Sequence, residues 1–479
     1  MSLLTDLYQL TMAYGYWKSG MAEKESVFHL FFRKNPFEGG YVVTCGLEYI
    51  IDFLREFKFS KDDLEYLTTL KTSAGTVLFE ADFLAYLKEM KFSCDIDAIP
   101  EGTVVFPHEP LIRVKGPILQ AQLIETALLN IINFQSLIAT KASRVSMAAK
   151  GEPVIEFGLR RAQGIDGGLA ASRAAYIGGC ASTSNVLAGK LFDIPVSGTH
   201  AHSWVMSFDS EMASFEAYAE ALPDNCIFLV DTFDTIKGIE KAITVGHLLK
   251  EKGKNMLGIR IDSGDLAYFS IKAREMLDAA GFTDAVIVAS NDLDEHIMNS
   301  LKDQDAKVNV WGVGTKLVTA YDQPALGAVY KLSAIANSED GWDYKIKLSE
   351  QSIKINNPGI QQVRRYFLNN QLLTDMIYDV DHLPSQRIKI IDPVDATKRK
   401  MIDEESLTFT DLLVPVFREG KCVYTGQNIH DIKTKVQHEL GQLHKGVKRF
   451  VNPHRYIVGL EQQLHNIKTD LILKLRNIE

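Results

Sequence analysis

Short apolar segments alternate with amphipathic stretches through the middle third of this chain. Each apolar segment ends in glycine or polar residues, and the segments cover 154–158, 194–198, 227–230, 256–261, 285–289 and 308–313. Between them, apolar residues at helical spacing predict helices near 169–177, 183–191, 212–221, 236–249, 266–279 and 294–301. Strands that alternate with helices form a parallel sheet, and six or more such units favour an irregular (β/α) barrel.

The two flanks of the chain follow a different pattern. Residues 26–44, 95–115, 345–348 and 387–391 have strand-like composition, whereas residues 119–149 and the tail from residue 431 predict helix. The sequence contains no internal repeat and no low-complexity linker. We therefore expect an α/β chain in which the barrel, residues 151–345, is inserted into a second α+β domain built from both termini, residues 1–150 and 346–479.

Composition and charge limit the class of partner and the compartment. Of the 479 residues, 46% are hydrophobic and 24% are charged, which predicts a large buried core. The formal net charge is −9 and no basic run exceeds residues 398–400, so we expect no nucleic-acid partner. Residues 123–139 are interrupted by polar side chains and residues 1–8 lack a basic region, so we expect neither a membrane span nor a signal peptide. Five cysteines without a CxxC motif indicate a reducing, cytoplasmic location.

Polar and charged residues follow almost every predicted strand. Active-site groups of a (β/α) barrel lie at the C-terminal ends of its strands, and burying many ionisable groups for structure alone is unfavourable. We therefore expect a site for a polar ligand at these ends. The candidates, in chain order, are Phe157, Arg160, Arg161, Thr199, His200, His202, Ser203, Asp231, Asp234, Arg260, Asp262, Asp265, Asn291, Gly314, Thr315 and Lys316.

Two groups of these candidates suit phosphate chemistry. Residues 312–315 are glycine-rich, which lets backbone N–H groups approach an anion. A tight turn without a ligand would have the same glycine-rich sequence. The carboxylates of Asp231, Asp234 and Asp262 suit Mg²⁺ or ribose hydroxyls. Each of them could instead cap a helix, as we expect of Asp265.

The segment 198–204 places His200 and His202 beside the hydroxyls of Thr199 and Ser203. A histidine in such a segment can act as a base, a metal ligand or a phosphate carrier. No third metal ligand stands out, so we expect no metal held by protein ligands alone. Proton or phosphoryl transfer fits the neighbouring phosphate signal better, and which of the two histidines would face the phosphate stays open.

Taken together, these segments resemble the nicotinate phosphoribosyltransferase family. The resemblance begins at residues 4–12 (LTDLYQLTM) and continues through 156–162 (EFGLRRA), 198–203 (GTHAHS), 260–264 (RIDSG), 290–292 (SND) and 312–315 (GVGT). It covers most of the chain and is weakest toward the C-terminus. It implies an ATP-assisted, Mg²⁺-dependent enzyme of NAD salvage, a cytoplasmic homodimer that transfers phosphoribose from phosphoribosyl pyrophosphate to nicotinate.

The resemblance also implies roles for the matching residues. His202 matches the family's phosphorylated histidine. Phe157 and Tyr8 match the two rings that stack on the pyridine, with Tyr8 supplied by the neighbouring subunit. The resemblance further implies contacts to the base carboxylate, the ribose and the phosphates from Arg160, Arg260, Asp262, Gly314 and Thr315.

Three alternatives remain at this point. The same fold could act on quinolinate or nicotinamide; nicotinamide-using relatives carry an acidic residue where this chain has 189–192 without one, although Asp193 is adjacent. A lyase or aldolase would need a Schiff-base lysine, for which Lys316 is the candidate at a predicted strand end. A non-catalytic metabolite-binding paralogue would not need His202.

Overall fold

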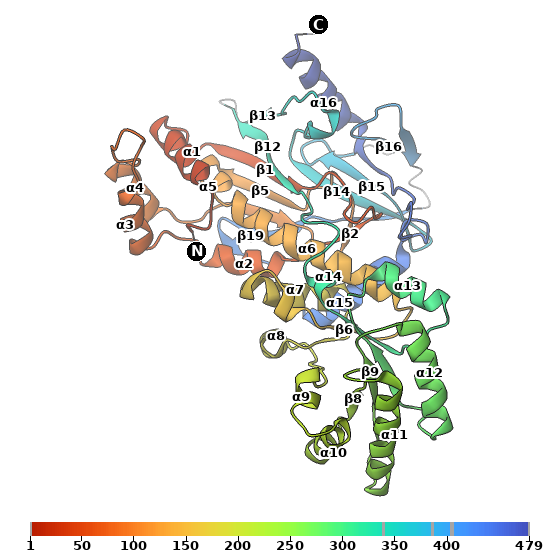
Figure 1. The fold of residues 1–479 in the computed structure, drawn as a ribbon. Coiled ribbons are helices and arrows are strands. Elements are labelled where there is room, and N and C mark those ends of the chain that lie inside the picture. The colour runs from red at the N-terminus through yellow and green to blue at the C-terminus, as the bar shows by residue number, and fades with distance from the viewer. Residues whose placement is uncertain (1, 338–340, 385–387, 403–406, 478–479) are drawn as a thin grey trace. The chain divides into compact units, whose positions relative to one another are not determined.

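The structure, a computed structural model, describes residues 2–337, 341–384, 388–402 and 407–477. The chain divides into two compact units, whose elements are labelled in Figure 1. Unit 1 contains Met1–Leu137 and Ala325–Glu479, and unit 2 contains Ile138–Pro324. The domain boundaries expected from the sequence, and the insertion of a closed barrel, stay predictions.

Unit 2 is built around a six-stranded parallel sheet. The strands lie in the order β7-β6-β11-β10-β9-β8, so the first strand of the series pairs with the last. This arrangement confirms the expected α/β fold with a parallel sheet. The strands are β6 Val154–Glu156, β7 Ser182–Thr183, β8 Ile227–Leu229, β9 Gly258–Ile261, β10 Val286–Ala289 and β11 Val310–Val313.

One expected strand, at residues 194–198, is reduced to a single bridge. Only Val196 pairs, with Thr183, in parallel orientation. The preceding residue, Pro195, has no N–H and cannot donate to a ladder. Within the described part of unit 2, no ladder joins this segment to β8. Closure of the sheet into a barrel therefore stays a prediction.

Five helices of unit 2 begin at a polar capping residue. Asn185, Ser210, Asp234, Asp265 and Asp294 each accept a hydrogen bond from a first-turn backbone N–H. Such caps satisfy donors that a helix end otherwise leaves unpaired. The helices are η1 Leu159–Arg161, α7 Gly164–Gly178, α8 Val186–Phe192, α9 His202–Met206, α10 Glu211–Ala221, α11 Thr235–Glu251, α12 Leu266–Ala279, α13 Glu295–Asp303 and α14 Thr315–Val318.

Unit 1 contains two sheets, the first of which draws strands from both ends of the chain. A seven-stranded antiparallel sheet has the order β13-β12-β1-β5-β3-β19-β20. Its strands are β1 Glu25–Phe31, β3 Asp95–Ala98, β5 Ile112–Pro117, β12 Val329–Ala336, β13 Trp342–Tyr344, β19 Val414–Arg418 and β20 Lys421–Cys422.

The second sheet of unit 1 has the order β17-β16-β21-β15-β14-β18, with β15 and β21 parallel. Its strands are β14 Gln361–Leu368, β15 Gln371–Asp379, β16 Ile388–Ile391, β17 Arg399–Ile402, β18 Thr408–Asp411 and β21 Val458–Glu461, and a separate pair joins β2 Val42–Val43 to β4 Val104–Val105. The remaining elements are α1 Leu7–Lys18, α2 Leu47–Arg55, α3 Lys61–Thr69, α4 Ala81–Glu89, α5 Ile118–Leu123, α6 Glu125–Ala148, η2 Ser352–Lys354, α15 Ile429–Gln442 and α16 Gln462–Leu475.

The prediction of a strand at residues 345–348 is wrong. Strand β13 ends at Tyr344, and the N–H of Lys347 donates to the side chain of Asn356 at 2.7 Å rather than to a neighbouring strand. Residue 387 of another expected strand lies outside the described residues. Strand β16 covers the rest of that segment, Ile388–Ile391.

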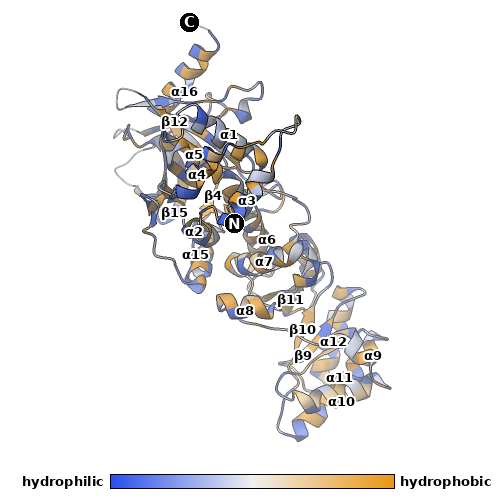
Figure 2. Ribbon diagram, turned by 90° about the vertical axis from the view of Figure 1, so that its left-hand side faces the viewer, coloured by the Kyte–Doolittle hydropathy of each residue, from blue (hydrophilic) through white to orange (hydrophobic). Residues whose placement is uncertain are grey.

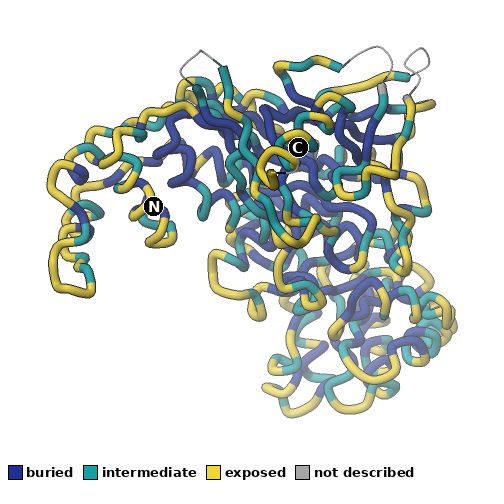
Figure 3. Tube along the Cα trace, turned by 90° about the horizontal axis from the view of Figure 1, so that it is seen from above, coloured by how far each residue is buried: buried dark blue, intermediate teal, exposed yellow. Residues whose placement is uncertain are grey.

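Burial follows the strands and the inner faces of the helices. Six of the seven residues of β1 are buried, for example, and Figure 3 colours the buried positions dark blue along the Cα trace. Figure 2 shows polar and apolar residues interspersed along the helices. Among the described residues, no helix is both long enough and apolar enough to cross a lipid bilayer.

A buried ionic cluster joins β14 to β15 in unit 1. The side chain of Arg365 is fully buried and donates to Asp375 at 2.6 Å and to Glu439 at 2.9 Å. The Tyr456 hydroxyl donates to Asp375 at 2.9 Å, and Glu109 lies beside the same carboxylate. Burial, followed by the charge of Asp375, raises the pKa of Glu109 well above its ordinary value despite the opposing charge of Arg365.

We expect this cluster to make stability depend on pH. The pKa of Glu109 is higher in the folded protein than in the unfolded chain, so its contribution is complete below the unfolded value of about 4.3 and is lost as pH rises toward the folded value. Urea unfolding across this range should show stability falling with pH, and Glu109→Gln should flatten that slope. The exposed control Glu65→Gln should leave the slope unchanged. An unaltered slope in Glu109→Gln would contradict the assignment.

Candidate functional site

A pocket of about 320 Å³ lies at the C-terminal ends of the parallel strands in unit 2. Six residues that the sequence predicted for the site line it together, although they come from three separate stretches of the chain. The lining residues are Phe157, Leu159, Arg160, Ser184, Gly198, Thr199, Ala201, His202, Leu229, Arg260 and Asp262.

His202 stands between two carboxylates at one wall of this pocket. Its Nε2 lies 4.0 Å from Asp231 Oδ1 and 3.8 Å from Asp262 Oδ2, and its Nδ1 lies 3.1 Å from the Thr232 hydroxyl. The imidazole is 38% exposed, whereas the Asp231 side chain is fully buried. Asp231 Oδ1 has no hydrogen-bond partner among the described residues. Asp231 is not among the residues that line the pocket, so its buried, unsatisfied carboxylate oxygen lies behind the reachable imidazole.

Arg260 connects the strand ends to one another. Its guanidinium donates to Ser290 at 2.9 Å, to Thr199 at 3.1 Å and to Asp262 at 2.9 Å. The same group lies over the Phe157 ring, 5.4 Å from the ring centroid. These four partners follow β10, the 194–198 segment, β9 and β6, so one planar cation fixes the positions of several strand-end segments.

Asp262 is the carboxylate that Arg260 holds. Burial alone would raise the pKa of Asp262, but hydrogen bonds from Ser290 and Arg260 and the charge of Arg260 outweigh it and leave the pKa below its ordinary value. Asp262 is therefore an anion across the neutral range. The Asp262 N–H donates to Asp231 Oδ2 at 3.0 Å, which ties the two carboxylate segments together.

Glu156 and Gly312 fix the position of the Phe157 ring. The buried Glu156 carboxylate accepts from the N–H of Gly158, from the Ser172 hydroxyl at 2.9 Å and from the Thr183 hydroxyl at 2.6 Å. A Cβ at position 312 would come within 2.7 Å of the Phe157 ring, so any residue larger than glycine would displace the ring. The sequence predicted Phe157 for the site and did not predict these two supports.

His200 does not face the pocket. Its ring is buried, its centroid lies 4.9 Å from that of Tyr218, and its Nε2 accepts from the N–H of Leu229 at 3.2 Å. Burial lowers the pKa of His200 to about 4. The residue spacing alone left the choice between the two histidines open, and the resemblance implied His202. The structure gives them different positions: His202 lines the pocket and His200 packs behind it.

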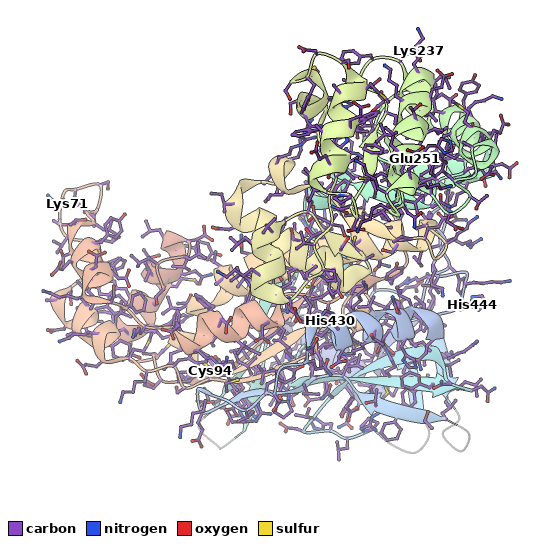
Figure 4. The ribbon with its side chains drawn as sticks, turned by 90° about the horizontal axis from the view of Figure 1, so that it is seen from below. Lys71, Cys94, Lys237, Glu251, His430 and His444 are labelled. Atoms are coloured by element: carbon purple, nitrogen blue, oxygen red, sulfur yellow. The ribbon has the colours of Figure 1, made fainter. Side chains whose placement is uncertain are left out.

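Other predicted site residues lie outside the pocket lining. Asp234 caps α11 and accepts from the N–H of Lys237 at 3.0 Å; Figure 4 labels Lys237 and Glu251 near the two ends of that helix. Ser203 and Asn291 are exposed, and Asn291 has a left-handed backbone with φ of 96°. Gly314 and Thr315 begin the short α14, and Tyr8 is an exposed residue of α1 in unit 1.

Lys316, the candidate Schiff-base lysine, is held in an ion pair. Its Nζ lies 2.6 Å from Asp294 Oδ2. Burial opposes the charge on Lys316, but the hydrogen bond and charge of Asp294 outweigh burial and raise the pKa of Lys316. A lysine that stays protonated is a poor nucleophile, which disfavours the lyase alternative.

Comparison with known proteins decides the family. The sequence matches the N-terminal domain of nicotinate phosphoribosyltransferase over residues 3–133, the nicotinate phosphoribosyltransferase family over 154–367 and the C-terminal domain over 360–468. The nicotinate phosphoribosyltransferase of Bacillus subtilis (strain 168) is 46% identical over 485 residues, which cover 98% of this chain and 96% of that protein. The chain belongs to the nicotinate phosphoribosyltransferase family.

Other members of the nicotinate phosphoribosyltransferase family agree with this assignment. The Caenorhabditis elegans nicotinate phosphoribosyltransferase is 37% identical and covers 98% of this chain and 93% of its own length. The crystal structure of human nicotinic acid phosphoribosyltransferase matches with a TM-score of 0.86 and 31% identity, over 98% of this chain and 100% of that one. The α/β fold described above is thus a fold of this family.

The different surroundings of the two histidines generate a test in solution. Because burial lowers the pKa of His200 to about 4, its ring should stay neutral, and its C–H chemical shifts should stay flat, between about pH 5.5 and 8. Two-dimensional NMR of ¹³C-histidine-labelled protein measures this. The His200 signal is identified by its absence in His200→Gln. A midpoint for that signal near the ordinary histidine value would contradict the buried position.

Proposed function

We propose that this chain is a nicotinate phosphoribosyltransferase of NAD salvage, which converts nicotinate and phosphoribosyl pyrophosphate to nicotinate mononucleotide and pyrophosphate with ATP hydrolysis. The observation that carries the proposal is the strand-end pocket, in which His202, Arg260, Asp262 and Phe157 converge in a chain of this family. Quinolinate and nicotinamide remain the competing bases. Asp193 is not among the residues that line the pocket, which favours an anionic base over the amide.

The residues of the pocket suit each part of the reaction. Phe157 offers a flat face to a pyridine ring, with Tyr8 of the partner subunit as the second face of the sandwich in a homodimer. Arg160 and Arg260 supply cationic donors for a carboxylate and for phosphate oxygens. As the bond from ribose C1 to pyrophosphate breaks, positive charge grows on the ribose, and the nearby Asp262 carboxylate stabilises it.

His202 is the proposed phosphate carrier. The Asp231 and Asp262 carboxylates lie on the Nε2 side of the ring and favour a proton there, which leaves the lone pair on Nδ1. In this step a nitrogen of His202 attacks the γ-phosphorus of ATP, the bond to the β-phosphate oxygen breaks, and ADP leaves. Later hydrolysis of phosphohistidine releases inorganic phosphate and returns the imidazole.

Mg²⁺ fits the same wall. The unsatisfied Asp231 Oδ1 and the Asp262 carboxylate are hard oxygen donors, and Mg²⁺ in proteins is usually held by one or two carboxylates together with substrate phosphates. When bound, the ion neutralises charge on the leaving pyrophosphate. Among the described residues, no group of three or more His, Cys, Asp or Glu side chains is placed to hold a metal ion without such a substrate.

Labelling tests the phosphohistidine. Protein incubated with [γ-³²P]ATP should retain label that is lost in acid and stable in base, and His202→Ala should lose both the label and the stimulation of turnover by ATP while keeping some basal transfer. His247→Gln, an exposed histidine of α11, is the matched control and should label normally. Normal labelling of His202→Ala would exclude His202 as the carrier.

Competition among the three bases tests the substrate. With phosphoribosyl pyrophosphate and ATP fixed, nicotinate should show the highest kcat/KM, and nicotinamide and quinolinate should compete weakly. Arg160→Ala should raise KM for nicotinate by about tenfold or more, because a charged hydrogen bond contributes about 1.5–3 kcal/mol. Preference for either other base would overturn the assignment of nicotinate as acceptor.

A further inference from the structure

The parallel sheet of unit 2 has one packed face and one open face. Side chains alternate along a strand, and those on the packed face lie toward helices such as α7 and α12. The residues on that face, each no more than 1% exposed, are Val154, Phe228, Ile287 and Trp311. Of their neighbours on the other face, Val288 is 1% exposed, whereas Ile155, Ile227 and Val310 are only half-buried.

These half-buried residues line a second cavity, of about 470 Å³. In a filled (β/α) barrel the inward side chains pack against one another and leave no such space. Here the aliphatic part of the lining stays accessible, since Val196 is 49% exposed and Leu257 is 41% exposed. The polar residues of the lining are Ser182, Ser197, Thr199 and Asn225. Keeping apolar surface in contact with water is unfavourable, and a volume of this size lies within the range of small-molecule sites.

The cavity adjoins the strand-end pocket but differs from it in chemistry. Phe157, Gly198 and Thr199 line both spaces. The far end of the cavity is formed by residues that precede strands, among them Pro153 and Leu257 (Figure 1 labels β6 and β9). Every residue that lines the cavity is uncharged, whereas the strand-end pocket carries Arg160, His202, Arg260 and Asp262. The anionic substrates proposed above therefore do not belong in the cavity, because an unpaired charge there would lose its hydration.

We propose that this cavity is a binding site for an uncharged, apolar small molecule that reaches the Phe157 end of the strand-end pocket. An occupant would touch Phe157, Gly198 and Thr199, the residues on which the proposed pyridine site depends. It would therefore weaken nicotinate binding without replacing phosphoribosyl pyrophosphate. This coupling rests on the proposed function, whereas the binding site itself does not.

A homologous series of 1-alkanols, from butanol to octanol, tests the site by isothermal titration calorimetry on the full chain. Because each buried CH₂ contributes about 0.8 kcal/mol, affinity should rise about fourfold for each added CH₂ until the chain fills the cavity. The α,ω-diols of equal length should bind more weakly, since their second hydroxyl would be buried. Affinity that is independent of chain length, or no saturable binding, would overturn the proposal and leave a water-filled cavity.

Filling the cavity from its far end provides the matched variant. Leu257→Trp should reduce octanol affinity at least tenfold, and Leu222→Trp, at a position of similar exposure outside the cavity, should not change it. Urea unfolding measures whether each variant is folded. If Leu257→Trp does not fold, Ala181→Leu provides a second, smaller obstruction of the cavity. Wild-type affinity in a folded Leu257→Trp would contradict the assignment.

Kinetics separates this inference from the proposed function. Octanol at saturation should raise KM for nicotinate and leave KM for phosphoribosyl pyrophosphate unchanged, and Leu257→Trp should abolish that effect while keeping basal turnover. Chain-length-dependent binding without turnover of any pyridine base would refute the proposed function and retain the cavity site. Normal turnover with no alkanol binding would refute the cavity site and retain the function.

Discussion

The hydrogen bonds of the Arg260 guanidinium hold the candidate site together. One side chain donates to the Thr199, Asp262 and Ser290 side chains and covers the Phe157 ring. Its partners stand on segments far apart in the sequence that the parallel sheet brings to one edge. A planar cation with several fixed donors can satisfy them together, which a lysine ammonium on a flexible stem does not. The Ser290 hydrogen bond and this contact keep Asp262 anionic, and the guanidinium covers the aromatic ring that Glu156 and Gly312 hold in position.

Below this layer, the sheet itself is asymmetric. One face is closed by Phe228, Ile287 and Trp311, and this packing makes the strand ends a rigid platform. Glu156 ties the Phe157 segment to the Ser172 and Thr183 hydroxyls from beneath. The opposite face is uncharged and unfilled. Charged groups at the strand ends and an uncharged space along the strands therefore lie next to each other in the same unit, and Phe157 belongs to both.

Much of this arrangement could be predicted from the sequence because the strand–helix alternation is local. The positions of Phe157, Arg260 and Asp262 after apolar segments placed them correctly at one edge, and Asp265 is the helix cap that its position before an amphipathic stretch predicted. These conclusions need only strand periodicity and the rule that C-terminal strand ends converge. The similarity of the motifs to a known family supplied the substrate class, which periodicity alone does not give.

The features that the sequence did not predict depend on tertiary contacts. The residue pattern alone does not distinguish His200 from His202, although the family resemblance indicated His202; in the structure the Tyr218 ring and the Leu229 N–H separate them. Asp234 has the same composition signal as Asp262, yet it caps a helix. The 194–198 segment looks like a strand by hydrophobicity, but Pro195 prevents a full ladder. The open cavity exists because side chains on one face of the sheet remain unpacked, and no local sequence pattern predicts which face that is.

The kinetics of Arg260→Lys measure how far the site depends on the Arg260 guanidinium. Lysine keeps the positive charge but loses the fork that binds three partners, so kcat/KM should fall by about 10²-fold or more while the protein remains folded. Arg274→Lys, which removes a similar fork to Asp278 and to two carbonyl oxygens of unit 2, is the control and should keep its kcat/KM. An Arg260→Lys enzyme with wild-type kcat/KM would contradict the account.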